Sequence, residues 1–102
     1  MPKIFEYFGI ILEFFVNDHE PIHVHATYGR EYGMKVELYV KDGKIIRREY
    51  KKLKGRKPFA PAQMRELKKL IEKYQYQIKQ DWIDVRVNKK KVTNKKIMRR
   101  IK

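Results

Sequence analysis

Apolar side chains recur at steps of three and four residues after Pro61, and this stripe constrains the fold more than any other feature. Such spacing places them on one face of an α-helix of about six turns. Proline suits the first helical position, where its missing N–H is no loss. The helix must bury its apolar face against a second layer, which the rest of the chain has to supply. The stripe consists of Met64, Leu67, Ile71, Tyr74, Ile78 and Trp82, widened by Leu70.

Four segments before the helix are predicted to be β-strands. They are rich in β-branched and aromatic residues, and they are separated by turn-forming residues. Asp42-Gly43 predicts a tight hairpin between the last two, because that pair accepts positive φ. We therefore expect an α+β fold, a small antiparallel sheet of about four strands covered on one face by one long amphipathic helix. The predicted strands are residues 10–16, 22–28, 34–40 and 44–50.

The size of the chain fits a single domain. It has 102 residues and 42% hydrophobic content, enough for one modest core. Residues 1–84 are predicted to form that domain, followed by a basic C-terminal tail, residues 85–102. The first residues of this second segment, with Ile83 and Asp84, fit either a short strand or the end of the helix. The tail has too little apolar surface for firm packing, so we expect it to be mobile in the free protein.

The chain contains no cysteine, which excludes a disulfide framework and a cysteine-ligated zinc site. This composition fits a reducing cytoplasm. Glu6 and Glu13 interrupt the apolar opening segment, so neither a signal sequence nor a membrane span is expected. We therefore expect a cytoplasmic protein that does not insert into a membrane.

The formal net charge of +14 is concentrated in two segments. Residues 1–46 carry five basic and seven acidic side chains, whereas residues 47–57 carry seven basic and one acidic. Residues 85–102 carry nine basic side chains and no acidic one. Such blocks are typical of polyanion contacts, and nucleic acid is favoured over an acidic protein or a membrane surface. A merely solvated charge run is an equal alternative. The residues expected to hold phosphates are Lys51, Lys52, Lys54, Arg56, Lys57, Lys89, Lys90, Lys91, Lys95, Lys96, Arg99 and Arg100.

All three histidines of the chain lie in the stretch HEPIHVH, at positions 19, 23 and 25. Side chains alternate between the faces of a strand, so His23 and His25 should point away from the helix-covered face. The same argument places Glu13 and Glu37 beside them, flanked by Phe15 and Tyr39. The uncovered face of the sheet is therefore the candidate site.

Three roles are open for this histidine cluster. As an acid–base pair, His23 and His25 would cleave RNA without a metal, with Glu13 or Glu37 orienting one of them. As metal ligands, His19, His23 and His25 would bind a divalent ion such as zinc; otherwise no cofactor is expected. As structural groups, they would form hydrogen bonds across strands or pack against a partner protein.

The stretch GIILEFFVNDHEPIHVHATYG, residues 9 to 29, resembles the prokaryotic family named domain of unknown function 4160. The motif Asp-His-x-Pro-x-His-x-His falls on Asp18, His19, Pro21, His23 and His25. The later helix, with its Leu-x-x-Leu-Ile core and a tryptophan near its end, is similar as well. The resemblance covers roughly residues 1 to 84 and leaves the basic tail outside.

The resemblance implies a two-protein module, because genes of this family tend to lie beside those of domain of unknown function 2442. It implies a small partner protein encoded next to this one and a toxin–antitoxin-like role. Taken with the charge, it leads us to expect nucleic-acid binding, RNA favoured, with a histidine-dependent ribonuclease activity. The alternatives are a non-catalytic module that binds a regulatory partner and a metal-binding protein. A homo-oligomer formed through an exposed edge strand stays open.

Overall fold

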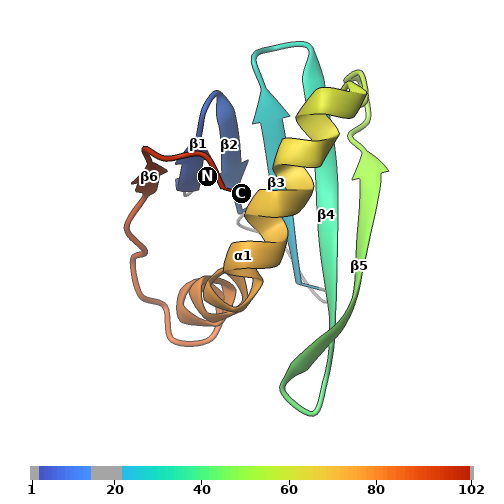
Figure 1. The fold of residues 1–102 in the computed structure, drawn as a ribbon. Coiled ribbons are helices and arrows are strands. Elements are labelled where there is room, and N and C mark those ends of the chain that lie inside the picture. The colour runs from blue at the N-terminus through green and yellow to red at the C-terminus, as the bar shows by residue number, and fades with distance from the viewer. Residues whose placement is uncertain (1–2, 15–21, 102) are drawn as a thin grey trace.

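A six-stranded sheet with one long helix across one face makes up the described part of the chain, residues 3–14 and 22–101 (Figure 1). The structure is a computed structural model. The helix α1 lies over the middle of the sheet, and the chain after it returns to one sheet edge (Figure 1). The elements are β1 (Lys3–Tyr7), β2 (Ile10–Glu13), β3 (Ile22–Tyr28), β4 (Tyr32–Lys41), β5 (Lys44–Lys52), α1 (Pro61–Arg86) and β6 (Lys95–Ile97).

The strands lie in the order β5-β4-β3-β2-β1-β6. Strands β1 to β5 pair antiparallel with their neighbours in the chain, which for β2 to β5 agrees with the antiparallel sheet expected from the sequence, and β6 pairs parallel with β1. The α+β class and the single covering helix are confirmed, but the expected number of about four strands is wrong. The described part of β2 ends at Glu13, one residue before the described residues break off.

The two additional strands, β1 and β6, lie together at one edge, and each lacks a clear sequence signal. The turn between β1 and β2 is Phe8-Gly9, with φ of 44° and 91°. Both residues have the positive φ of a tight hairpin. Phenylalanine rarely adopts a positive φ, so the sequence does not indicate this turn. Strand β6 has only three residues, of which two are lysines.

The hydrophobic core fills the space between α1 and the sheet. Apolar residues of β1 to β4 face it, among them Leu12, Val24 and Val36, each fully buried. From α1 the buried members of the stripe include Leu67 and Ile71. The predicted inner face of the sheet and the role of the helix as cover for the core are both confirmed.

Local hydrogen bonds define both ends of α1. At the N-terminus, the Ala60 N–H donates to the Gln63 side-chain oxygen at 2.9 Å, and Pro61 occupies the first helical position. At the C-terminus, the Val87 N–H donates to the Ile83 carbonyl at 2.8 Å. The helix runs to Arg86, so residues 83–86 are helical and the alternative of a short strand there is wrong.

The C-terminal segment is packed against the domain, which differs from the expected mobile tail. Beyond the pairing of β6 with β1, the buried Tyr7 hydroxyl donates to Glu66 at 2.8 Å and accepts the Ile101 N–H at 2.9 Å. Lys95 donates to the buried Asp81 at 3.0 Å. These contacts join residues far apart in the chain, which explains why local composition did not predict them.

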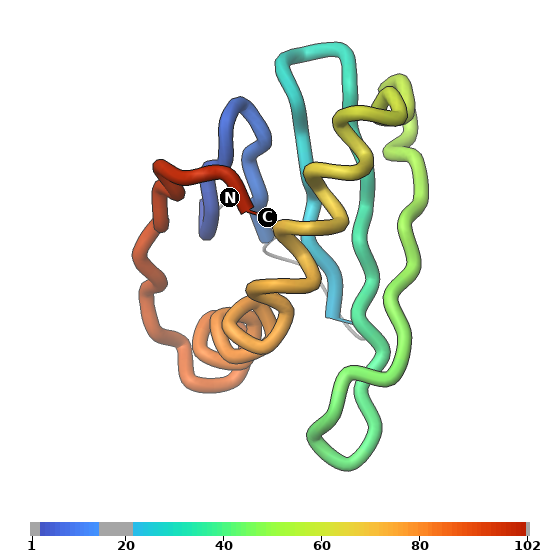
Figure 2. The backbone as a smooth tube through the Cα atoms, viewed as in Figure 1, coloured from blue at the N-terminus to red at the C-terminus, as the bar shows by residue number. Residues whose placement is uncertain are grey.

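The β4–β5 hairpin extends beyond the end of the sheet formed by the shorter strands, as the backbone tube shows (Figure 2). Helix α1 supports it near its turn. The Lys79 ammonium donates to the Gly43 carbonyl at 2.9 Å, and the Tyr76 hydroxyl accepts the Ile45 N–H at 3.2 Å. No helix in the described residues is both long and apolar enough to span a membrane.

Candidate nucleic-acid interface

The histidine strand β3 lies inside the sheet, between β2 and β4. Its even-numbered residues from Ile22 to Ala26 are buried under α1, while His23 and His25 are half-buried on the opposite face. Their ring centroids are 5.7 Å apart with an interplanar angle of 31°. The alternation of β3 thus presents both imidazoles side by side, as predicted. His19, Phe15 and the rest of residues 15–21 lie outside the described residues, so the predictions that include them stay predictions.

The register of the strands decides which groups surround each histidine. His25 is the Cα partner of Glu13 on β2 and of Lys35 on β4, and His23 is the Cα partner of Glu37. One row across the uncovered face therefore runs from Glu13 through His25 and Lys35 to Lys51 on β5. The predicted grouping of both carboxylates with the two histidines is confirmed by the pairing.

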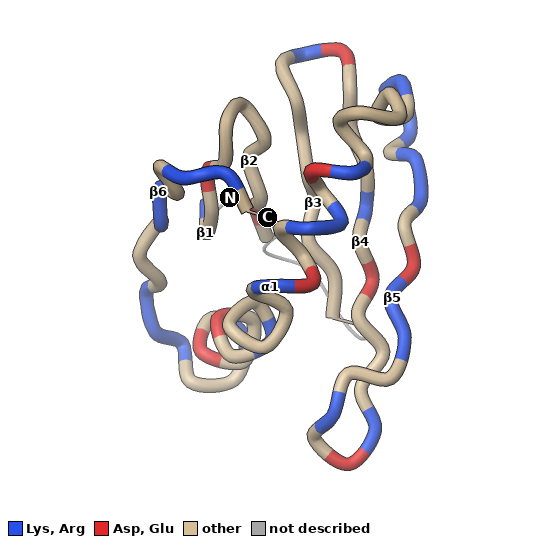
Figure 3. Tube along the Cα trace, viewed as in Figure 1, with Lys and Arg blue, Asp and Glu red and all other residues tan. Residues whose placement is uncertain are grey.

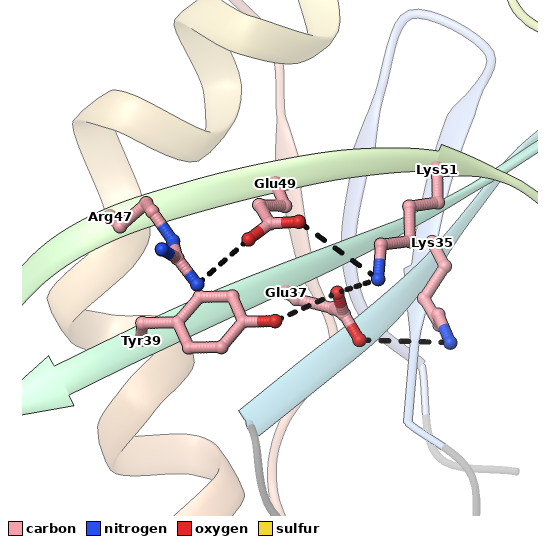
Figure 4. A network of polar contacts seen from close by, with 6 residues as sticks. All are labelled: Lys35, Glu37, Tyr39, Arg47, Glu49 and Lys51. Atoms are coloured by element: carbon pink, nitrogen blue, oxygen red, sulfur yellow. Dashed lines mark hydrogen bonds and ion pairs between the residues drawn. The ribbon is translucent and has the colours of Figure 1, made fainter.

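Glu37 is buried although it lies on the uncovered face, because neighbouring side chains cover it. Its carboxylate accepts from the Lys51 ammonium at 2.8 Å and from the Tyr39 hydroxyl at 3.2 Å, and lies 3.7 Å from the Lys35 ammonium (Figure 4). The hydrogen bond from Lys51 is the main cause that lowers the pKa of Glu37, against the opposing effect of burial. The same hydrogen bond raises the pKa of Lys51. Glu37 is thus an anion held by two lysines.

Tyr39 and Arg47 extend this network toward the end of the β4–β5 hairpin. The Arg47 guanidinium lies 4.2 Å from the centroid of the Tyr39 ring and 2.9 Å from the Glu49 carboxylate (Figure 4). The guanidinium therefore covers one face of the Tyr39 ring in a cation–π contact. Lys35, Arg47 and Glu49 were not singled out in the sequence as site residues. The alternation of β4 and β5 is the signal that could have found them.

Replacing Glu37 with glutamine should lower the free energy of unfolding by about 1.5–3 kcal/mol near neutral pH. The amide cannot balance Lys35 and Lys51, which are Cα partners and would then repel each other. Because folding lowers the pKa of Glu37, its ion pairs stabilise the wild type above the unfolded pKa. This stabilisation is lost as the pH falls through the folded pKa. Urea unfolding of both proteins from neutral to acidic pH measures the effect.

The matched control for this prediction is Glu31→Gln. The Glu31 carboxylate is 67% exposed and pairs only loosely with Lys57, at 3.9 Å, so the change should cost less than about 0.5 kcal/mol. A difference between wild type and Glu37→Gln that stays constant into acid would contradict the assigned ion pairs.

The basic linker after β5 folds back on the start of β4. The Gly33 N–H donates to the Lys57 carbonyl at 3.0 Å, and a side chain at Gly33 would meet Arg56 and Leu53. The Lys52 ammonium donates to the Leu53 and Arg56 carbonyls. Lys52 and Arg56 therefore help to shape the linker, while Lys54 is exposed and Lys57 largely so.

The cations of the tail also divide into those that contact other side chains and those that are exposed to solvent. Lys95 and Arg100 are engaged, the first with Asp81 and the second with Glu66 at 3.7 Å and with the Phe8 ring at 4.1 Å. Lys96 and Arg99 are exposed. The consecutive lysines Lys89, Lys90 and Lys91 lie exposed in the connection between α1 and β6.

The two basic segments lie at opposite edges of the sheet, because residues 47–57 comprise most of β5 and the linker after it, and residues 85–102 contain β6 (Figure 3). With neighbouring strands about 4.8 Å apart, six strands separate these edges by roughly 24 Å. The structure therefore does not bring the two segments together. The histidine strand lies between them.

The metal interpretation concerns three histidines of which the structure describes two. Within residues 3–14 and 22–101, no group of three histidine, aspartate or glutamate side chains is placed to hold a metal ion. A site completed by His19 lies outside this range. The imidazoles of His23 and His25 are the part of it that the structure positions.

The comparisons with known proteins identify a family. A family model described as a domain of unknown function (DUF4160) matches residues 9–83. Neither the curated proteins nor the solved structures contain a significant match. The matched range covers β2 to β5 and most of α1, while β1 and β6, which pair with each other, lie outside it. With about three quarters of its length matched, the chain belongs to the DUF4160 family.

Proposed function

We propose that this protein binds RNA across the uncovered face of the sheet and cleaves it with His23 and His25. The observation that carries the proposal is the row formed by His25, Lys35 and Lys51, with His23 beside it. Paired imidazoles provide an acid and a base near neutral pH. Ammonium groups next to them supply attraction for a phosphate.

The distribution of charge supports an RNA strand that crosses the sheet from edge to edge. The uncovered face itself is nearly balanced, since Glu37 and Glu49 offset Lys51, Lys35 and Arg47. The excess cations lie at the two edges, in the linker after β5 and around β6 (Figure 3). A single strand held at both edges would place its central phosphates over β3. Recognition of single-stranded RNA on an open sheet face is a recurrent solution.

The proposed chemistry uses the RNA 2′-hydroxyl as nucleophile. His25 takes its proton while the 2′-oxygen attacks phosphorus, and His23 protonates the departing 5′-oxygen. The products are a 2′,3′-cyclic phosphate and a free 5′-hydroxyl, so protons and bonds balance without a metal. Both imidazoles need to come within about 3 Å of oxygens on one phosphate, which their centroid separation of 5.7 Å permits.

The two candidate carboxylates take different parts in this proposal. Glu13 is the cross-strand neighbour of His25 and is assigned to orient it and to stabilise its protonated form. Glu37 neighbours His23, but two lysines hold its charge. Its role is to position Lys35 and Lys51 beside the histidines. The toxin-like role in a two-protein module is the biological form of this proposal.

Cleavage of a labelled RNA, followed on a gel with and without chelator, tests the proposed function. We expect the wild type to cleave in chelator and His23→Ala/His25→Ala to lose cleavage, because acid and base are both removed. Thr27→Ala, on the same strand and face, is the matched control and should cleave as the wild type does. Loss of wild-type cleavage in chelator would instead favour a metal site. Equal cleavage by all variants would overturn the histidine mechanism.

A second candidate function, binding of a protein partner without catalysis, is favoured by the edge strand β5. Its nine residues form one edge of the sheet, and Ile46 on it is 64% exposed. An added strand could pair there. The strand carries five basic residues and one glutamate, which disfavours pairing with a second copy and favours an acidic strand. A wild type that does not cleave RNA would support this candidate.

A further inference from the structure

A basic groove lies between α1 and the C-terminal segment. It has a volume of about 900 Å³. Five cations and one carboxylate line it, together with the apolar side chains of Tyr74, Ile97, Met98 and Ile101. The charged lining residues are Lys69, Glu72, Lys73, Lys96, Arg99 and Arg100.

The groove is built by the contacts that hold the C-terminal segment in place. The Tyr7 hydroxyl fixes the backbone at Ile101, and Lys95 is anchored on Asp81. Arg100 is held at one end by Glu66 and by the ring of Phe8. These anchors set the wall opposite α1 before any ligand binds, so the ordering of this wall costs a ligand little.

Three of the lining cations keep their charge available. Within the described residues, Lys73, Lys96 and Arg99 form no ion pair with a carboxylate. Arg100 lies 3.7 Å from Glu66, whereas Lys69 approaches Glu66 only to 4.0 Å and can still contact a phosphate. Lys73 lies 5.7 Å from the Tyr74 ring centroid. Unbalanced cations around a hollow attract a ligand with several negative charges.

The groove adjoins the uncovered face of the sheet at Lys96. This residue also lines a second hollow, of about 360 Å³, together with Glu6 and Ile11. Glu6 is the Cα partner of both Lys96 and Ile11, in a row that continues to Thr27 on the histidine strand. A strand that leaves the uncovered face over β6 therefore meets the groove next.

We propose that this groove holds the phosphate backbone of the RNA that crosses the uncovered face, with its ribose and base parts against the apolar lining. The inference rests on the proposed function and assigns new binding residues, Lys69 and Lys73 on α1. The 900 Å³ hollow exceeds the need of one phosphate group, and its cations come from both walls. A flexible single strand with regularly spaced phosphates fits this arrangement. Lys96 is the link between the groove and the face that carries His23 and His25.

The test is the salt dependence of binding to a fluorescent 12-nucleotide RNA with 2′-O-methyl groups, which cannot be cleaved. Lys69→Gln/Lys73→Gln should bind about 5- to 25-fold more weakly near 0.1 M salt. Its slope of log K against log salt should be smaller by about 1.4, or 0.7 per lost phosphate contact. Lys68→Gln/Lys79→Gln is the matched control, with the same charge change on the same helix outside the groove. It should keep most of the affinity and slope.

Further outcomes separate this inference from the proposed function. If both double lysine variants bind RNA equally more weakly than the wild type, the assignment of the groove is overturned, while the proposal that the protein binds RNA still stands. No binding by the wild type would overturn both proposals. Displacement of the RNA by poly-glutamate as readily as by unlabelled RNA would overturn the assignment to RNA. Cleavage at saturating RNA should persist in Lys69→Gln/Lys73→Gln, since the histidines lie on the other face of the sheet.

Discussion

Replacing Ile71 with alanine should lower the free energy of unfolding by about 2–5 kcal/mol. Ile71 is fully buried in the middle of α1, and α1 is the only helix within the described residues that covers the sheet. The substitution removes buried methyl and methylene groups and leaves a cavity that rigid strands cannot fill. A loss of this size is a large part of the stability of a domain of this length.

Urea unfolding followed by the fluorescence of Trp82, the single tryptophan, measures this effect. Val87→Ala is the control, because that apolar side chain is 66% exposed and should contribute less than about 0.5 kcal/mol. A loss below about 1 kcal/mol in Ile71→Ala would contradict the role of α1 as the cover of the core.

Breaking the ion pair between Asp81 and Lys95 is expected to have the second large effect. Either Asp81→Ala or Lys95→Met should cost about 2–4 kcal/mol, because each leaves one charge without its partner next to the core. The Asp81 side chain is 5% exposed and that of Lys95 is 37% exposed. Lys95→Met, which leaves the buried Asp81 without its cation, should therefore lower the stability more than Asp81→Ala. Among the residues that the structure describes, Asp81 then keeps only the hydrogen bond from the Gln77 side chain, at 2.8 Å.

A double-mutant cycle of Asp81→Ala, Lys95→Met and Asp81→Ala/Lys95→Met tests whether the pair itself is responsible. The double variant should recover stability relative to Lys95→Met, because two apolar side chains replace two charges. Limited trypsin digestion gives a second measurement, since the C-terminal segment, residues 85–102, contains many lysines and arginines. Single variants should be cut there faster than the wild type. Additive effects and unchanged cleavage would mean that the ion pair does not hold the segment.

The part of the fold that could be predicted from the sequence is the part whose signal is local. The stripe on α1 and the alternation of β3 and β4 each bury one face, so their position relative to the core follows from their own residues. This was enough to place His23 and His25 on the uncovered face. It was not enough for β6, whose place depends on a partner strand about ninety residues earlier.

The candidate site shows the same limit. The presence of Glu37 near the histidines follows from alternation, but its capture by Lys51 depends on the pairing of β4 with β5. The pairing of β4 with β5 includes a register shift between Tyr39 and Val40, and no turn-forming residue in the sequence predicts it. The two basic segments were only partly predictable from the sequence. Their charge was visible in the sequence, whereas their separation to opposite edges required the strand order.

The pairing of β6 with β1 also has a consequence for how the chain acquires its structure during translation. The hydrogen bond between Tyr7 and Ile101 joins residues 94 positions apart, so the edge of β1 stays uncovered until residues 95–101 have been synthesised. Strands β2 to β5 and α1 connect near neighbours and can assemble earlier. An unpaired β1 edge in the nascent chain is open to association with other strands. Ribosome pausing before residues 95–101 would prolong that exposure, and the codons of this segment would then influence the yield of folded protein.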